Sequence, residues 1–275
     1  MGSIMRFFEG CTALITGASA GFGAEFARQL APHAHALVLV ARRNDRLEAL
    51  RDELEGVFPD LRVYPYAMDV ADEAQRVRFV EWLGEQDISV DFLINNAGLG
   101  DAGSFDSAEW ERTKQILEVN IVALTHLTHL ILPLMHHVGR AAILNVSSVA
   151  GFFPLPNHAV YGASKAYVTQ FSEALRMELK GSGISVTALC PGPSPTEFRR
   201  VAGREGVDFE QLPEEDGFSS FRVDPHQVVA SGLDAVARDR ARVIPGPLLS
   251  LAVAAALVVP FCLVRRWIEK NRHCF

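Results

Sequence analysis

Cysteine is scarce in this chain of 275 residues, and its four cysteines form no Cys-x-x-Cys pair. That spacing indicates reduced thiols and an intracellular setting. No His-Glu-x-x-His motif or neighbouring cysteine accompanies the nine histidines, so we predict no metal site. The 26 basic residues are outnumbered by 33 acidic ones, and no basic run is longer than two arginines. The chain is therefore a poor candidate for binding nucleic acid.

The first ten residues include Arg6 and Glu9 and lack the apolar core of a secretory signal. Internal repeats and low-complexity segments are also absent from the sequence. Hydrophobic residues make up 49% of the chain and charged residues 21%, which excludes disorder, collagen and coiled coil. The composition predicts a globular protein with a substantial core.

Short apolar runs rich in β-branched residues alternate with stretches of helical period. The runs are Thr12–Thr16, Ala36–Ala41, Leu61–Ala67, Asp91–Asn95, Ala141–Ser147 and Ile184–Cys190. The helical stretches include Gly21–Ala31, Asp45–Gly56, Asp72–Gln86, Ala108–His137 and Tyr161–Gly181. Such alternation predicts an α/β fold, a doubly wound parallel sheet (Rossmann-like) of six to seven strands with helices on both faces. Arg242–Pro245 is a weaker seventh run, and a TIM barrel needs more strands.

We expect one dinucleotide-binding catalytic domain over residues 8–247, followed by a separate C-terminal segment over 248–275. The domain includes one long irregular segment, 191–224, which contains glycine, proline and an acidic group. A loop of this length inside a domain is usually functional, so we predict that it contacts the substrate.

Residues suited to chemistry follow every predicted strand. In strand order they are Gly17, Gly21 and Gly23; Arg42 and Arg43; Asp69; Asn96-Ala97-Gly98; Ser147-Ser148; and Pro191-Gly192. Ligands of open α/β sheets bind outside the carboxyl ends of the strands. The pattern therefore predicts one continuous site along that edge.

Gly17 to Gly23 joins the first strand to the first helix with the spacing Gly-x-x-x-Gly-x-Gly. Glycines let the backbone approach a pyrophosphate, and the helix N-terminus supplies free N–H groups and a positive dipole. This predicts a dinucleotide site. The alternative is an ordinary tight turn between strand and helix, because the spacing is not the general Gly-x-Gly-x-x-Gly fingerprint.

Arg42 and Arg43 follow the second strand, where NAD-binding proteins place an acid that bonds the ribose 2′-hydroxyl. The first acid here is Asp45. An arginine matches the 2′-phosphate of NADP, with Ser19 as an additional hydroxyl donor, and a carboxylate repels it. NADP is therefore favoured, against the alternative of a solvated basic pair at a helix start.

Tyr161 and Lys165 lie four residues apart, so they share one face of a helix. A tyrosine has an ordinary pKa of about 10, so proton transfer near neutrality requires a pKa about three units lower. A lysine ammonium and a positive nicotinamide ring would both lower it. The alternative is an exposed pair of neighbours without chemistry.

Taken together, these residues resemble the short-chain dehydrogenase/reductase family over about Phe8 to Pro247. The motifs in common are Thr16–Gly23, Asn95-Asn96-Ala97-Gly98, Asn120, Asn145-Val146-Ser147-Ser148, Tyr161-x-x-x-Lys165 and Pro191-Gly192-Pro193. Their order and spacing match those of the family, which makes the combination specific.

The resemblance implies a catalytic set of four residues. Tyr161 is the expected general acid/base, and Lys165 lowers its pKa and bonds the nicotinamide ribose. Ser148, rather than Ser147, holds the substrate oxygen, because it stands three residues before Gly151. Asn120 holds a water that links Lys165 to solvent.

The resemblance also implies how NADP(H) is bound. Asp69 contacts the adenine, Asn96 lies along the adenosine ribose, and Thr196 touches the carboxamide or a phosphate. Ser194-Pro195 departs from the family pattern just before Thr196. The full set of predicted cofactor residues is Gly17, Ser19, Gly21, Phe22, Gly23, Arg42, Asp69, Asn96, Gly98, Tyr161, Lys165, Pro191, Gly192 and Thr196.

The function we predict is hydride transfer between NADP(H) and a small-molecule carbonyl or alcohol. Apolar residues in adjacent segments suggest a lipophilic substrate, with ordinary loop packing as the alternative. They are Leu99, Phe152, Phe153, Pro154, Leu155, Pro156, Phe198, Phe218 and Phe221. A non-catalytic dinucleotide-binding scaffold or redox sensor is the alternative function, which would need none of the four catalytic residues.

Family members of this kind are commonly homodimers or homotetramers, which makes His126 and His129 candidate interface residues. Residues 248–264 are apolar apart from Ser250 and Pro260, and a basic cluster follows. Seventeen residues are at the short limit for a spanning helix. We expect a cytoplasmic enzyme, and two interpretations of 248–264 stay open. It attaches the protein to a membrane, or it packs over the substrate mouth or a subunit contact.

Overall fold

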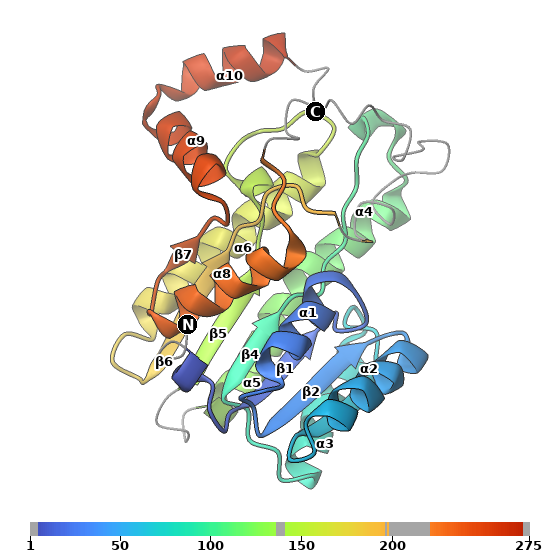
Figure 1. Ribbon diagram of the computed structural model, residues 1–275. Coiled ribbons are helices and arrows are strands. Elements are labelled where there is room, and N and C mark those ends of the chain that lie inside the picture. The colour runs from blue at the N-terminus through green and yellow to red at the C-terminus, as the bar shows by residue number, and fades with distance from the viewer. Residues whose placement is uncertain (1–4, 136–140, 196, 198–220, 272–275) are drawn as a thin grey trace.

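Seven parallel strands form one sheet in the order β3-β2-β1-β4-β5-β6-β7 (Figure 1). The strands are β1 (Thr12–Thr16), β2 (Ala36–Ala41), β3 (Arg62–Ala67), β4 (Phe92–Asn95), β5 (Ala141–Val146), β6 (Ile184–Leu189) and β7 (Arg242–Val243). The computed structural model describes residues 5–135, 141–195, 197 and 221–271. The predicted doubly wound α/β sheet is confirmed, including its weak seventh strand.

Helices cover both faces of the sheet (Figure 1). They are α1 (Gly21–Leu30), α2 (Asn44–Val57), α3 (Glu73–Glu85), α4 (Trp110–Leu117), α5 (Leu124–Met135), α6 (Ala159–Glu178), α8 (Pro225–Ala237), α9 (Pro247–Val258) and α10 (Phe261–Lys270). Short 3-10 turns occur at Met5–Phe7, Phe105–Ser107 and Val149–Gly151. A π-helical turn, Glu118–Ala123, joins α4 to α5 where the sequence predicts one uninterrupted helix.

The core has two halves, one on each side of the sheet. Apolar residues of α1, α2 and α8 pack on one face, and those of α3, α5 and α6 pack on the other. Side chains alternate across a strand, so Leu37 and Leu39 of β2 enter the first half and Val38 and Val40 the second. Strands buried on both faces need apolar residues at every position, which explains the continuous runs in the sequence.

A seam of buried polar side chains ties β4 and β5 to the helices behind them. Asn95 Nδ2 donates to Thr128 Oγ1 and to Asn145 Oδ1, each at 2.9 Å. Asn145 Nδ2 donates in turn to Ser172 Oγ at 2.9 Å. Because these groups are buried, each lost partner leaves a polar atom without solvent to replace it.

A second buried polar contact involves Arg76 of α3, which is 1% exposed. Its Nε donates to His126 Nδ1 at 2.9 Å, and its Nη1 donates to the Val70 carbonyl at 2.6 Å. His126, a predicted interface residue, is thus held by a contact within the chain, and its part in an interface stays a prediction. His129 is exposed on α5, and its part in an interface stays a prediction.

The C-terminal segment forms two helices that project from the rest of the fold (Figure 1). α9 and α10 break near Pro260 and are bent by 119°. Only Leu249 and Val253 of α9, and Ile268 of α10, are buried. Helix α9 is thus buried only in part within the described residues, and both interpretations of 248–264 stay predictions.

Substitution of Asn145 by alanine should strongly destabilise the protein. It removes two hydrogen bonds, leaves one N–H of Asn95 without an acceptor and opens a small cavity. We expect a loss of about 3 kcal/mol in the free energy of unfolding, measured by urea denaturation. Ser185→Ala is the control, because its buried hydroxyl has no partner in the described residues. A loss for Asn145→Ala no larger than that of the control would contradict this account.

Candidate active site

The turn between β1 and α1 depends on glycine, as Gly17 and Gly23 show. Gly17 has a φ of +69°, which favours a residue without Cβ. A Cβ on Gly23 would lie 2.2 Å from the Gly17 carbonyl oxygen and 2.7 Å from Asn96 Nδ2. Helix α1 begins directly after Ala20, with no side chain capping its first turn. Its N-terminal N–H groups are therefore available to an anion such as a phosphate.

Asn96 holds this turn against the end of β4. Its Nδ2 donates to the carbonyls of Thr16 at 2.9 Å and Gly17 at 3.3 Å. The backbone N–H groups of Asn96 and Ala97 both donate to Thr16 Oγ1 at 3.0 Å. The structure thus gives Asn96 a supporting contact with the glycine turn. The contact with an adenosine ribose implied by the resemblance stays a prediction.

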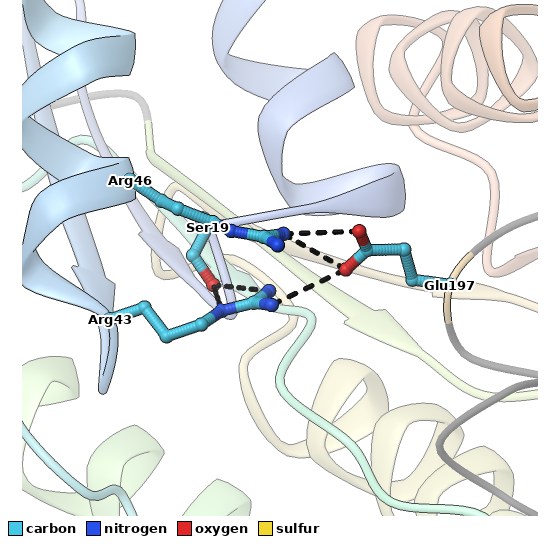
Figure 2. Close-up of polar contacts among 4 residues, drawn as sticks. All are labelled: Ser19, Arg43, Arg46 and Glu197. Atoms are coloured by element: carbon cyan, nitrogen blue, oxygen red, sulfur yellow. Dashed lines mark hydrogen bonds and ion pairs between the residues drawn. The ribbon is translucent and has the colours of Figure 1, made fainter.

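A cluster of charges lies beside the glycine turn (Figure 2). Ser19 Oγ accepts from Arg43 Nε at 3.2 Å and Nη2 at 3.0 Å. Glu197 Oε2 accepts from Arg43 Nη1 at 3.3 Å and from Arg46 Nη1 at 3.0 Å. Glu197 Oε1 accepts from Arg46 Nη1 at 3.1 Å. We call these four residues the arginine cluster.

Arg42, the arginine predicted to meet the cofactor, is exposed and is not part of the arginine cluster. Its contact with the cofactor stays a prediction, whereas Arg43 is the residue that reaches Ser19. Sequence reasoning missed Arg46 and Glu197. Arg46 had a signal, because it stands three residues after Arg43 at the start of a helix. Glu197 had none, because it comes from a distant segment.

Lys165 lies at the centre of a second group of polar side chains. It is buried in α6, and its Nζ donates to the Val146 carbonyl at the end of β5, at 2.9 Å. A Cβ on Gly98 would lie 3.3 Å from Lys165 Nζ and 3.4 Å from Asn120 Oδ1. The predicted residues Lys165, Asn120 and Gly98 therefore meet at one point.

Asn120 sits in the π-helical turn between α4 and α5. Its Nδ2 donates to the Leu99 carbonyl and to Ser164 Oγ, each at 2.9 Å, and its Oδ1 accepts from Leu99 N–H at 2.8 Å. Both amide hydrogens are used by the protein. Only the second lone pair of Oδ1 is left for the water that the resemblance implies.

Ser148 is the serine that reaches Tyr161. The Ser148 side chain opposes the rise that burial causes in the pKa of Tyr161, while its Oγ donates to the Pro191 carbonyl at 3.4 Å and accepts from Ala150 N–H at 3.1 Å. Ser147 Oγ instead donates to the Lys165 carbonyl at 2.7 Å, inside the fold. A Cβ on Gly151 would lie 2.7 Å from Ala166 N, so this glycine lets the serine turn approach α6.

Burial dominates the protonation of Tyr161 and Lys165. Burial lowers the pKa of Lys165 to about 8, because the charged amine loses its water. Burial also raises the pKa of Tyr161, and the Ser148 hydrogen bond opposes that rise. The protein by itself does not produce the lowered tyrosine pKa that the sequence led us to expect. Lys165 Nζ is 5.9 Å from the Tyr161 ring centroid and donates to Val146 instead.

The other predicted residues that the structure describes lie at the same edge of the sheet, and three predicted residues fall outside the described part of the chain. Asp69 Oδ1 accepts from Ala71 N–H at 2.9 Å, directly after β3. Pro191 and Gly192 follow β6, and a Cβ on Gly192 would lie 2.4 Å from Leu249 Cδ2 of α9. Gly21 and Phe22 are half-buried in the first turn of α1. Thr196, Phe198 and Phe218 lie outside the described residues.

Comparison with known proteins gives consistent matches. The family model of the short chain dehydrogenases matches residues 11–205. A sulfoacetaldehyde reductase of Chromohalobacter salexigens is 43% identical over 199 residues, covering 70% of this chain and 76% of that protein.

Two solved structures also resemble the chain. The short-chain dehydrogenase from Sphingobium yanoikuyae in complex with NADPH has a TM-score of 0.78 and 34% identity, covering 95% of this chain and 96% of that one. The bulky-bulky ketone specific alcohol dehydrogenase from Comamonas testosteroni has a TM-score of 0.73 and 29% identity, covering 91% and 94%.

The lowered pKa of Lys165 can be measured directly. In the protein without added nucleotide, one lysine side-chain resonance should titrate near pH 8 in ¹³C NMR, and it should be missing in Lys165→Met. An unfolded lysine keeps its proton up to about 10.5, so the unfolded state binds more protons between the two values. Stability relative to Lys165→Met should therefore rise from about pH 8 to 10.5. Titration of that resonance above pH 10 would show that the amine is solvated.

Proposed function

The chain belongs to the short-chain dehydrogenase family, and we propose that it is a carbonyl reductase in which Tyr161 and Ser148 act on the carbonyl oxygen. The predicted dependence on NADP(H) is confirmed by the comparisons. The observation that carries the proposal is the buried amine of Lys165, which donates to the end of β5 next to the serine turn and lies 5.9 Å from the Tyr161 ring centroid. The same group of side chains argues against the alternative of a non-catalytic scaffold or redox sensor.

The residues present fit an NADP(H) molecule along the sheet edge. The glycine turn and the open N-terminus of α1 suit the pyrophosphate, and Ser19, Arg43 and Arg46 offer several donors to a 2′-phosphate. The predicted contacts of Arg42, Asp69 and the Pro191-Gly192 turn are retained as part of this proposal. When bound, NADPH supplies the hydride.

The side chains at the other end of the edge would then bind the carbonyl and supply a proton. Ser148 donates a hydrogen bond that orients the substrate oxygen, and Tyr161 gives its phenolic proton to that oxygen as the hydride reaches the carbon. The phenolate left behind is stabilised by the charge of Lys165. Asn120 positions this group by holding Leu99 and Ser164 in place. In the reverse direction Tyr161 accepts the proton of an alcohol.

We also propose a lipophilic substrate. Leu99, Phe152, Phe153 and Phe221 are half-buried and lie in segments next to the catalytic residues. Apolar lining with few polar groups is the usual form of a pocket for such ligands. The ketone-specific dehydrogenase from Comamonas testosteroni is in agreement with this assignment. The sulfoacetaldehyde reductase relative points instead to a small anionic aldehyde, so the substrate panel must include both.

Removal of the Tyr161 hydroxyl should abolish catalysis and spare cofactor binding. We expect the kcat of Tyr161→Phe with NADPH and a bulky ketone to fall about 10³-fold, because the general acid is lost. The affinity for NADPH, measured by fluorescence titration, should change little. Tyr167→Phe, a change on the same helix that removes a hydroxyl bonded to Thr125, is the control. Full activity of Tyr161→Phe would refute the mechanism, and turnover of sulfoacetaldehyde but no ketone would refute the lipophilic substrate.

The membrane interpretation of the C-terminal segment is also retained as a proposal. Large apolar side chains are exposed on both helices, among them Leu251, Val258, Phe261, Leu263 and Trp267. Arg265, Arg266 and Lys270 lie on the same short helix as Trp267. The 119° bend favours a pair lying in the interface over a straight span. The continuous helical stretch Trp110–Met135 is also long and apolar, but 44% of its most apolar window is buried inside the fold.

Charge reversal on α10 should weaken binding to anionic lipid. In cosedimentation with phosphatidylserine vesicles, Arg265→Glu/Arg266→Glu should bind at least about tenfold more weakly than the unmodified chain. Arg62→Glu/Arg78→Glu changes two exposed arginines elsewhere and serves as the control. If the unmodified chain does not bind vesicles and instead self-associates through α9 and α10, the segment is a subunit contact. A homodimer or homotetramer, which stays a prediction, would then be built through this segment.

A further inference from the structure

The arginine cluster is a site built for an anion, and it already contains one. Two guanidinium groups from the start of α2 point at one carboxylate, Glu197, which comes from the segment after β6 (Figure 2). The hydrogen bond from Arg46 lowers the pKa of Glu197, so this side chain is charged at neutral pH. Two positive charges and one negative charge leave the cluster with a net positive charge.

We propose that Glu197 competes with the 2′-phosphate of NADP(H) for Arg43 and Arg46 and thereby sets the affinity of the protein for phosphorylated over unphosphorylated nucleotide. This inference rests on the proposed function, which places the 2′-phosphate at these arginines. It goes further by assigning a role to Glu197, a residue that would not touch the cofactor. Glu197 is thus a specificity-determining residue that acts through the two arginines.

The competition follows from the donors that the two anions share. The carboxylate uses the Nη1 atoms of both arginines, at 3.0 to 3.3 Å. A phosphate monoester has a charge of about −1.5 to −2 and several acceptor oxygens, so it binds the same guanidinium groups more strongly than a carboxylate does. Two anions held by the same donors repel each other. Binding of the phosphate therefore requires that Glu197 moves away.

The exposure of the three charged side chains sets the expected effect of Glu197 on nucleotide affinity. The side chains of Arg43, Arg46 and Glu197 are 42%, 40% and 38% exposed. Exposed ion pairs change an equilibrium constant only a few-fold each, because water screens them. Glu197 can therefore be displaced by a nucleotide. A nucleotide without the 2′-phosphate does not bind the shared donors, so Glu197 should not affect its affinity.

Binding of two nucleotides to the full chain tests this proposal without catalysis. The probes are 2′,5′-ADP, which has the 2′-phosphate, and 5′-ADP, which lacks it, both measured by isothermal titration calorimetry at low salt. In Glu197→Gln the dissociation constant for 2′,5′-ADP should fall about 3- to 10-fold. That for 5′-ADP should stay within about twofold. An unchanged or weaker affinity of Glu197→Gln for 2′,5′-ADP would overturn the competition.

Glu53→Gln is the matched control. Glu53 forms an equally exposed pair with Arg28, with donor–acceptor distances of 2.7 and 2.8 Å, away from the glycine turn. This variant makes the same change of net charge and should leave both dissociation constants as they are. A gain for 2′,5′-ADP in Glu53→Gln equal to that in Glu197→Gln would show a general charge effect and overturn the proposal.

Arginine variants separate this proposal from the one on which it rests. Arg43→Ala and Arg46→Ala should each reduce the preference for 2′,5′-ADP over 5′-ADP about 3- to 10-fold, because the phosphate loses one guanidinium partner. Arg42→Ala should reduce it less. If these two variants keep the preference, the phosphate site itself is misplaced. If they lose it and Glu197→Gln gains nothing, the phosphate site stands and the competition is wrong. In Arg46→Ala/Glu197→Gln the gain should be smaller than in Glu197→Gln.

Discussion

The amine of Lys165 is the group around which the rest of the site is arranged. Burial removes its water, and the Val146 carbonyl at the end of β5 supplies one of the three acceptors that an ammonium can use. The pKa of Lys165 is lowered because its hydrogen bonding within the protein only partly replaces the lost water. A buried cation of this kind is costly, and it persists because the surrounding fold fixes its position. The amine lies near Gly98, Asn120 and Tyr161.

Polar groups inside the fold make that position rigid. A hydrogen bond between Asn95 and Asn145 joins β4 to β5, and Asn145 donates to Ser172 of α6. The helix that presents Tyr161 and Lys165 is therefore tied to the strand that presents Val146 and Ser148. Ser147 precedes Ser148 and is buried. Its hydroxyl is hydrogen-bonded to the Lys165 carbonyl and to Thr169 Oγ1, and both contacts hold the same helix in place. Structural hydrogen bonds thus set the distances between the chemical groups.

Most of the sheet was predictable because strands buried on both faces leave a continuous apolar run. The helix predicted over Ala108–His137 was harder, since the residues of a π-helical turn have the same composition as those of an α-helix. Asn120 sits in that turn, which belongs to the rare π-helical class often found at functional sites. The choice between Arg42 and Arg43 depends on where the strand ends and the helix begins, to within one residue. Glu197 is 154 residues from Arg43 and 151 residues from Arg46 in the sequence, so no local sequence pattern predicts their contact.

The contact between Gly192 and Leu249 has a consequence for where the chain can be shortened. Leu249 fills the space beside the Pro191-Gly192 turn that a side chain at position 192 would need. The first turn of α9 thus packs against the Pro191-Gly192 turn, whereas its later residues, such as Val258, are exposed. The C-terminal segment therefore has a packed part and a more exposed part, divided within α9. A chain cut before Leu249 would lose part of the catalytic fold together with the tail, and one cut after Val253 would lose the tail alone.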